Sequence, residues 1–168
     1  MRSLTAILFV ALTVGLFPGR GNAQGDASDQ VFMIASKLSR QTTEMADIVS
    51  SLEQHAKRTS VAEDKLAILL AGSRILTIAL VFGLEADLLG GSQLLRHGEK
   101  PKYFKHRIEQ MTRTRGVIRI LSQDLPTLRD TLKASDVKQL ISQALPRVES
   151  GLDLLDLGAV TLSATAAP

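Results

Sequence analysis

The sequence predicts an all-helical protein, an antiparallel four-helix bundle that remains after an N-terminal signal peptide is removed. Three observations support this fold class: apolar residues recur at helical spacing, the 168-residue chain contains neither Cys nor Trp, and its first two dozen residues are mostly apolar. The abundance of Leu, Ala, Ile and Val favours helix packing over a β-sandwich. Without Cys, disulfides, thiolate metal sites and thiol catalysis are excluded.

The N-terminal segment has the three parts of a secretory signal. Arg2 is followed by the apolar stretch 4–17, a break at Pro18, and small residues that end at Ala23. We expect cleavage between Ala23 and Gln24, because the apolar stretch is short for a membrane span and helix breakers follow it. An uncleaved N-terminal anchor is the alternative. The predicted location is the bacterial periplasm or the medium, as for secreted proteins.

The expected domains are a signal peptide (1–23), a helical bundle (24–158) and a flexible C-terminal tail (159–168). The first helix is expected from Ser28, because Val31, Leu38, Met45 and Leu52 recur seven residues apart. It should end in a hairpin near 57–60. Ser60 and Glu63 have the spacing of a capping box and predict a new helix start.

The second predicted helix, 61–97, is the most apolar part of the mature chain. Between Leu66 and Leu84 only Arg74 is charged. A helix that is apolar on nearly all sides lies in a bundle core, in an oligomer interface or in a membrane. Arg74 argues against a membrane span, since a charge in a span costs about 2.5 to 3.5 kcal/mol. Membrane association through this helix remains an open alternative.

The third predicted helix begins at Pro101, and the sequence around Pro126 interrupts the chain before a short helical piece. Ser135 then caps a final helix that contains Pro146. We expect this last helix to be kinked or split at Pro146, because proline cannot donate a hydrogen bond to the carbonyl of Ser142. Gly158 is the expected C-cap.

Positive charge is concentrated in the third helix. Residues 96–119 contain eight Lys or Arg and two Glu, whereas the chain from Gln24 onward has 18 basic and 17 acidic residues. Such segregation predicts an anionic partner: an acidic protein surface, an anionic membrane surface or a glycan. A solvated helix face is the alternative. Nucleic acid is an unsuitable partner for an exported chain with few aromatic residues. The expected basic patch comprises Lys100, Lys102, Lys105, Arg107, Arg113 and Arg119.

Two charged pairs are predicted among the apolar stripes. Arg74 and Glu85 lie eleven residues apart on one helix face and are the candidate site for a small anion between helices. Alternatively, a neighbouring carboxylate pairs with Arg74.

Asp87 and Arg115 are expected to form an interior ion pair. The run Ala71-Gly72-Ser73-Arg74 is faintly similar to the Ala-Gly-x-x-Arg stretch that begins the ligand-binding helix of periplasmic nitrate-sensing bundles, with one residue in place of two between Gly72 and Arg74.

No cofactor, metal site or enzymatic activity is expected. A Gly-rich phosphate loop, a G-x-S-x-G elbow and His-Glu-x-x-His are all missing from the sequence. The three histidines, His55, His97 and His106, are spread over both ends of the second helix, and a pairing of His97 with His106 is the only plausible metal site.

The sequence thus predicts an exported accessory or scaffold protein of the cell envelope. It would act by binding a protein partner or by self-association. A periplasmic bundle that binds a small anion near Arg74 is the alternative.

Overall fold

The computed structural model describes residues 23–96 and 98–166, and every regular element in these ranges is helical. The all-helical prediction is confirmed. Most of the predicted signal peptide lies outside the described residues, and the expected cleavage site, Ala23 and Gln24, begins the first helix. The elements are α1 (Ala23–Arg58), α2 (Ala62–Gly91), the short 3-10 helix η2 (Ser92–Leu94), α3 (Lys100–Ser122), α4 (Leu125–Thr131) and α5 (Ser135–Ala166).

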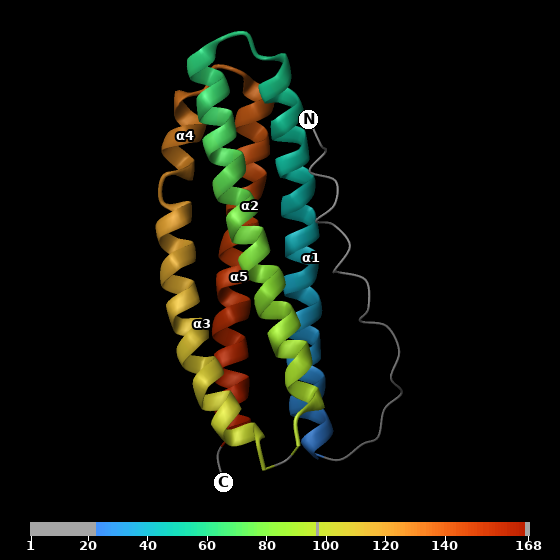
Figure 1. Ribbon diagram of the computed structural model, residues 1–168. Coiled ribbons are helices and arrows are strands. Elements are labelled where there is room, and N and C mark those ends of the chain that lie inside the picture. Colours follow the sequence, from blue (N-terminus) through green and yellow to red (C-terminus); the bar gives the residue numbers. More distant parts are fainter. Residues whose placement is uncertain (1–22, 97, 167–168) are drawn as a thin grey trace, which may run out of the picture.

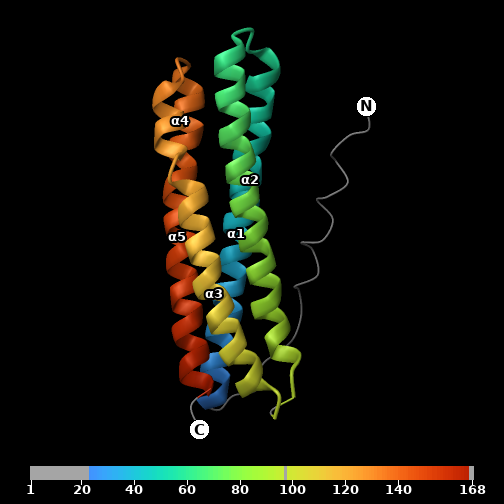
Figure 2. The same cartoon turned by 60° about the vertical axis from the view of Figure 1, so that its left-hand side comes forward.

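The four long helices lie side by side, and the chain reverses direction between successive long helices (Figure 1). The short α4 continues along the line of α3, so that α3 and α4 together span the length of the other helices (Figure 2). Helix α1 packs extensively against α2 and α5, and α3 packs mainly against α5. The contact between α2 and α3 is much sparser.

The core lies between these helices and is formed by rows of apolar residues at helical spacing. On α1 the predicted row of Val31, Leu38, Met45 and Leu52 is buried, which confirms the heptad reading of that helix. Helix α2 and helix α5 contribute the other large buried side chains. They include Ile68, Ile75, Ile78, Phe82 and Leu89 of α2 and Val137, Ile141, Val148 and Leu155 of α5.

The turn between α1 and α2 lies where the sequence predicts it, but the capping box does not form. Helix α2 has Val61 as its N-cap, with no hydrogen bond from a capping side chain, and Ser60 is exposed. The Lys65 N–H donates to the Val61 carbonyl at 3.0 Å, so the first helical turn starts one residue later than the capping box requires.

Helix α5 differs from the prediction in two respects. It is continuous through Pro146 and therefore not split there, whereas the expected kink stays a prediction. Pro146 and Ser142 both lie on the exposed side of the helix, where water can bind the carbonyl that proline leaves free. The expected tail is also helical as far as Ala166, and Leu162 is fully buried. Gly158 is not a C-cap: a Cβ atom there would overlap the Met111 side chain, so this glycine allows α5 to approach α3 closely.

Helix α2 is long and apolar enough, by length and composition, to cross a membrane. Within the bundle, however, only 39% of its most apolar window is buried. Helix α2 therefore has two apolar faces, one in the core and one that faces outward.

Candidate functional site

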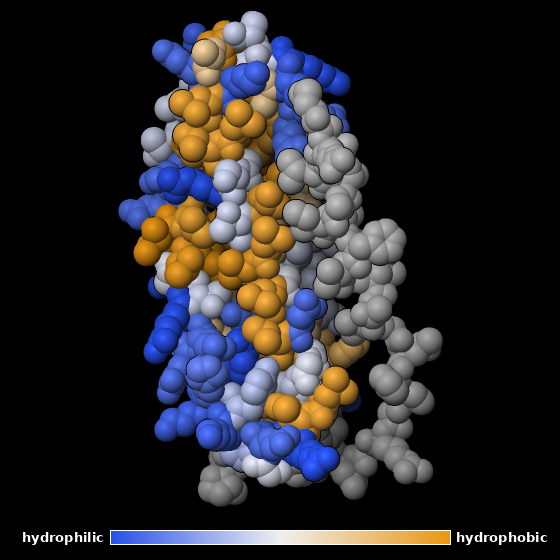
Figure 3. Space-filling model, in the orientation of Figure 1, coloured by the Kyte–Doolittle hydropathy of each residue, from blue (hydrophilic) through white to orange (hydrophobic). Residues whose placement is uncertain are grey.

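Among the described residues, the outward face of α2 carries most of the exposed leucines, and the sequence did not separate this face from the core. Its five leucines are each between 45% and 60% exposed, and small polar residues lie at its centre. In Figure 3, hydrophobic residues run along most of the length of α2. We call this surface the α2 outer face, and it consists of Leu66, Leu69, Leu70, Ser73, Thr77, Leu80 and Leu84.

Two residues of α3 extend this surface. Val117 is 50% exposed and Ile120 is 68% exposed. The guanidinium of Arg74 donates to the Leu121 carbonyl at 3.2 Å, which places this part of α3 beside the middle of α2. A contiguous exposed apolar surface on a small protein typically marks a binding surface for a protein or a membrane.

The predicted anion site of Arg74 and Glu85 does not form, because the two side chains have different partners. Arg74 pairs with Asp124 at 2.8 Å and also binds the Leu121 carbonyl. The alternative considered from the sequence, a neighbouring carboxylate for Arg74, matches this arrangement. Arg74 therefore has a carboxylate and a carbonyl as partners within the fold.

Glu85 instead forms a buried ion pair with Arg107 of α3. The Glu85 carboxylate also accepts a hydrogen bond from the Thr114 hydroxyl at 2.9 Å, and Arg107 donates to Gln110 at 2.5 Å. The side chains of Arg107 and Glu85 are only 2% and 5% exposed. One polar atom of the cluster, Arg107 Nε, has no hydrogen-bond partner among the described residues.

This buried pair joins α2 and α3, which otherwise contact each other sparsely. Its charges satisfy each other in the interior, and removal of one partner would leave the other unpaired. Near the end of α2, the Tyr103 hydroxyl donates to the Leu88 carbonyl at 3.0 Å, so polar contacts join α2 and α3 along much of their shared length. The sequence signal for the pair was Glu85 itself, the single carboxylate among apolar residues 66–86.

The predicted interior pair of Asp87 and Arg115 is wrong. Asp87 is exposed, because it lies two residues after Glu85 and therefore on the opposite side of α2. Arg115 pairs with Asp156 of α5 at 2.6 Å. Its Nε atom is buried without a hydrogen-bond partner in the described part of the chain.

The basic patch on α3 loses one predicted member. Arg107 points into the core and pairs with Glu85, so it does not belong to the surface. Lys102, Lys105, Arg113 and Arg119 are exposed, and Lys100 is half-buried. None of these five forms an ion pair with a described residue. The remaining patch is thus a mainly cationic surface whose five basic residues form no ion pair within the described part of the chain.

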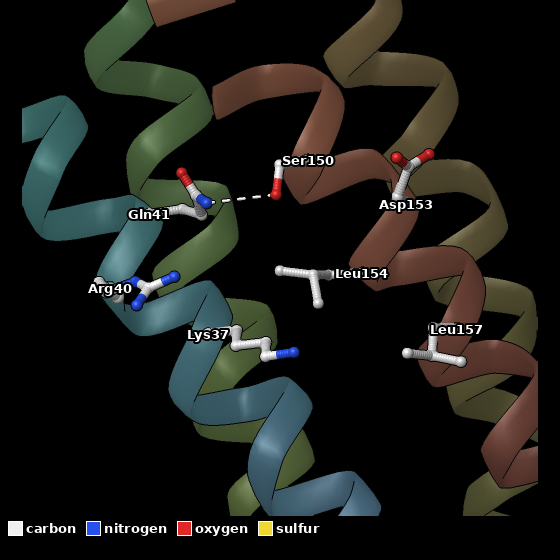
Figure 4. Close-up of a pocket in the computed structure, with 7 residues that line it drawn as sticks. All are labelled: Lys37, Arg40, Gln41, Ser150, Asp153, Leu154 and Leu157. Atoms are coloured by element: carbon white, nitrogen blue, oxygen red, sulfur yellow. Dashed lines mark hydrogen bonds between the residues drawn. The ribbon is translucent and has the colours of Figure 1, made fainter. Parts of the chain in front are cut away.

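A shallow cavity of about 250 Å³ lies between α1 and α5 (Figure 4). Gln41 donates to the Ser150 hydroxyl at 3.3 Å, and its own Oε1 has no partner among the described residues. The lining mixes both charge signs, with Lys37 and Arg40 on α1 and Asp153 on α5. This volume is below the range of about 300–1,000 Å³ typical of ligand pockets.

The histidines do not come together as metal ligands in the described residues. The Nδ1 atom of His55 lies 3.4 Å from the Oδ2 atom of Asp136 on α5. This pair lies at the opposite end of the bundle from the exposed His106. His97 lies outside the described residues. The described residues contain no cluster of three or more potential metal ligands.

The most distinctive surfaces are therefore the α2 outer face and the basic patch of α3, joined by a buried ion pair. Comparisons of the chain with protein-family models, with curated proteins and with solved structures find no match.

Proposed function

We propose that this protein is exported, loses residues 1–23, and acts as an interaction or scaffold component of the cell envelope through the α2 outer face. The folded unit in this proposal is an antiparallel four-helix bundle, and no enzymatic role is assigned to it. The single observation that carries the proposal is the row of exposed leucines on a helix whose opposite face already fills the core. A partner that covers these leucines removes their apolar surface from water, and this burial stabilises the complex.

The ion pairs inside the bundle support a folded unit in water over a membrane-spanning α2. Glu85 is charge-paired with Arg107, and Arg74 is paired with Asp124, which is itself more than half exposed. A spanning α2 would have to carry Glu85 and Arg74 into the hydrocarbon without these partners, at a cost of several kcal/mol.

The basic patch of α3 supports an anionic partner surface beside the apolar one. Lys102 and Arg113 are exposed on the helix next to α2 and lack internal counter-ions among the described residues. An acidic rim on the partner protein would fit an apolar centre with cations at one side. An anionic membrane surface or a glycan would use the same charges without requiring the leucines.

Export is tested by expressing the full chain in a bacterial host and fractionating the cells. We expect the mature protein in the periplasmic fraction with Gln24 as its N-terminus, measured by N-terminal sequencing and intact mass. Substitution of Ala23 by a bulky residue, Ala23→Leu, should block cleavage because signal peptidase sites require small residues. Retention of an uncleaved wild-type chain in the cytoplasm would refute export.

The interaction is tested with a photo-crosslinking amino acid at position 80, in cells that export the protein. We expect a cross-link to one defined protein, either a second copy of this chain or another envelope protein, identified by mass spectrometry and lost when Leu84→Glu is added. Position 53 provides the matched control, since Glu53 is exposed on α1 away from the α2 outer face. Equal cross-linking at positions 80 and 53, or none at position 80, would contradict the proposal.

A further inference from the structure

The α2 outer face has the spacing of a coiled-coil seam. Six of its residues follow one another at intervals of four, three, four, three and four positions, and they are Leu66, Leu70, Ser73, Thr77, Leu80 and Leu84. All six are exposed. Alternating steps of three and four keep a stripe facing one partner helix along its whole length. The core residues of α2 occupy other positions, so this second stripe is not needed for the bundle itself.

The seam reads almost the same in both directions. Its residue types in order are two leucines, a serine, a threonine and two leucines, centred on Ile75. If a second α2 is laid against it in the opposite direction, Leu66 meets Leu84, Leu70 meets Leu80, and Ser73 meets Thr77. Such self-complementarity is what a two-fold interface between identical chains requires.

The centre of the seam allows close approach. Ser73 and Thr77 are small, and the Thr77 hydroxyl already donates to the Ser73 carbonyl at 2.9 Å within its own helix. Small residues at a helix crossing bring the two backbones together, as in other close helix pairs. The leucines on both sides would then pack in layers around the two-fold axis.

The charges at the two ends of the seam bear on the kind of partner and not on the direction of pairing. Asp87 is exposed at one end of the seam, and Glu63 and Lys65 are exposed at the other. In the antiparallel register Asp87 lies opposite Glu63 of the second copy, and in parallel pairing Asp87 lies opposite Asp87. Acidic residues therefore meet at the ends in either direction, and the direction rests on the residue types of the seam. The acidic ends and the lack of exposed cations between Leu66 and Leu84 disfavour an anionic lipid surface.

The area of the surface sets the expected strength of the contact. The seam from Leu66 to Leu84 is about 27 Å long and about 10 Å wide, on helix dimensions. This strip alone is well below the roughly 800 Å² per partner of a standard stable interface. Val117 and Ile120 enlarge it beside the two-fold axis. The contact should therefore be a weak, concentration-dependent dimer.

We propose that the α2 outer face pairs in antiparallel orientation with the same face of a second copy of this chain, about a two-fold axis near Ile75. This inference rests on the proposed function, because it uses the same docking surface and names its occupant. The inference adds to the proposed function the identity of the partner, the antiparallel direction of the two α2 helices and the register in which they pair.

The register is tested by disulfide formation, for which the Cys-free chain provides a clean background. Leu66→Cys and Leu84→Cys both replace exposed residues. When the two variants are mixed and mildly oxidised, we expect a disulfide-linked dimer that contains one of each, measured by mass spectrometry. Either variant alone should give no dimer, because identical positions would lie about 27 Å apart along the axis, beyond the Cα separation of about 7 Å that a disulfide tolerates. Dimers of the single variants in place of the mixed dimer would overturn the antiparallel register.

Self-association is measured separately on the protein without cysteine substitutions. Sedimentation velocity over a wide concentration range should show a monomer that converts to a dimer, and Leu80→Glu should shift this transition at least ten-fold higher in concentration. The matched control is Val160→Glu, which places the same charge at an exposed apolar position of α5 and should leave the transition unchanged. A monomer at all concentrations would refute the inference.

The outcomes also separate this inference from the proposed function. A strictly monomeric protein that still cross-links through position 80 to a different envelope protein would overturn the dimer and leave the proposed function intact. Co-sedimentation of the monomer with phosphatidylglycerol vesicles, abolished by Leu80→Glu, would assign the face to lipid and also overturn the dimer. A dimer with the predicted disulfides but no envelope partner would support the inference while removing the accessory role.

Discussion

The two faces of α2 are both largely apolar but have opposite surroundings. The inner face, with Ile75, Ile78 and Phe82, is fully buried against α1 and α5, whereas Leu80 and Leu84 of the outer face are more than half exposed. Burial of a large apolar side chain contributes about 1.5–3 kcal/mol to stability. The inner face therefore holds the bundle together, and the outer face can contribute that amount only when a partner covers it.

The first prediction separates the two faces by their contribution to folding. Phe82→Ala should lower the free energy of unfolding by about 3–5 kcal/mol, because a fully buried ring leaves a cavity. Leu80→Ala should change it by about 0.5 kcal/mol or less, because Leu80 is 53% exposed. Urea unfolding followed by circular dichroism, at concentrations where the protein is monomeric, measures both. Equal losses in the two variants would mean that the outer face already contributes to the fold of the monomer.

The second prediction compares two acidic residues of α2 that are two positions apart. Glu85→Ala should cost roughly 3 kcal/mol, the lower end of the range for breaking a buried ion pair, since Arg107 keeps Gln110 as a partner. Asp87→Ala is the matched control and should be nearly neutral, because Asp87 is exposed.

The double variant Glu85→Leu with Arg107→Met tests whether the cost arises from the unpaired charge. We expect it to recover most of the stability, since apolar residues of similar size can replace a buried ion pair. If the double variant is as unstable as Glu85→Ala, the loss does not come from an unpaired charge. The hydrogen bonds of the pair would then stabilise the contact between α2 and α3 in a way that apolar residues cannot replace.

The third prediction concerns the glycine of α5 that faces the inner side of α2. A Cβ at Gly151 would overlap the Phe82 ring, so Gly151→Ala should destabilise the protein by about 1–3 kcal/mol. The cost should shrink in a Phe82→Leu background, where the smaller side chain makes room. Thermal unfolding of the four proteins in this double-mutant cycle measures the coupling. Additive effects would show that the cost of Gly151→Ala does not come from overlap with the Phe82 ring.

The contrast between the faces also explains what the sequence could and could not predict. On α1, apolar residues occupy one stripe, and the heptad spacing of Val31 to Leu52 identified the core side directly. On α2, apolar residues surround the helix, so helical periodicity does not distinguish inside from outside. Arg74 and Glu85 were therefore matched to each other, although each has its partner on a different segment, Asp124 and Arg107.

The remaining errors have a similar cause. Arg107 lies in a run of basic residues, and only the three-dimensional packing shows that this one points inward. Gly158 looked like a helix end, because glycine is the usual residue there, whereas its role is to admit Met111. The structural role of each residue depends on a side chain from another helix, Glu85 of α2 for Arg107 and Met111 of α3 for Gly158.

The last and smallest prediction applies the same reasoning to a glycine on the outside of the bundle. Gly116 lies on the exposed side of α3, and a Cβ there would meet no atom within 4 Å. Gly116→Ala should therefore raise the free energy of unfolding by up to about 1 kcal/mol, from helix propensity alone. Thermal unfolding at low protein concentration measures this gain, with Gly151→Ala as the buried counterpart that should change in the opposite direction. A loss of stability at Gly116 would mean that its surface, one residue from Val117, is covered even in the monomer, and that the outside of the bundle has been assigned wrongly on this side.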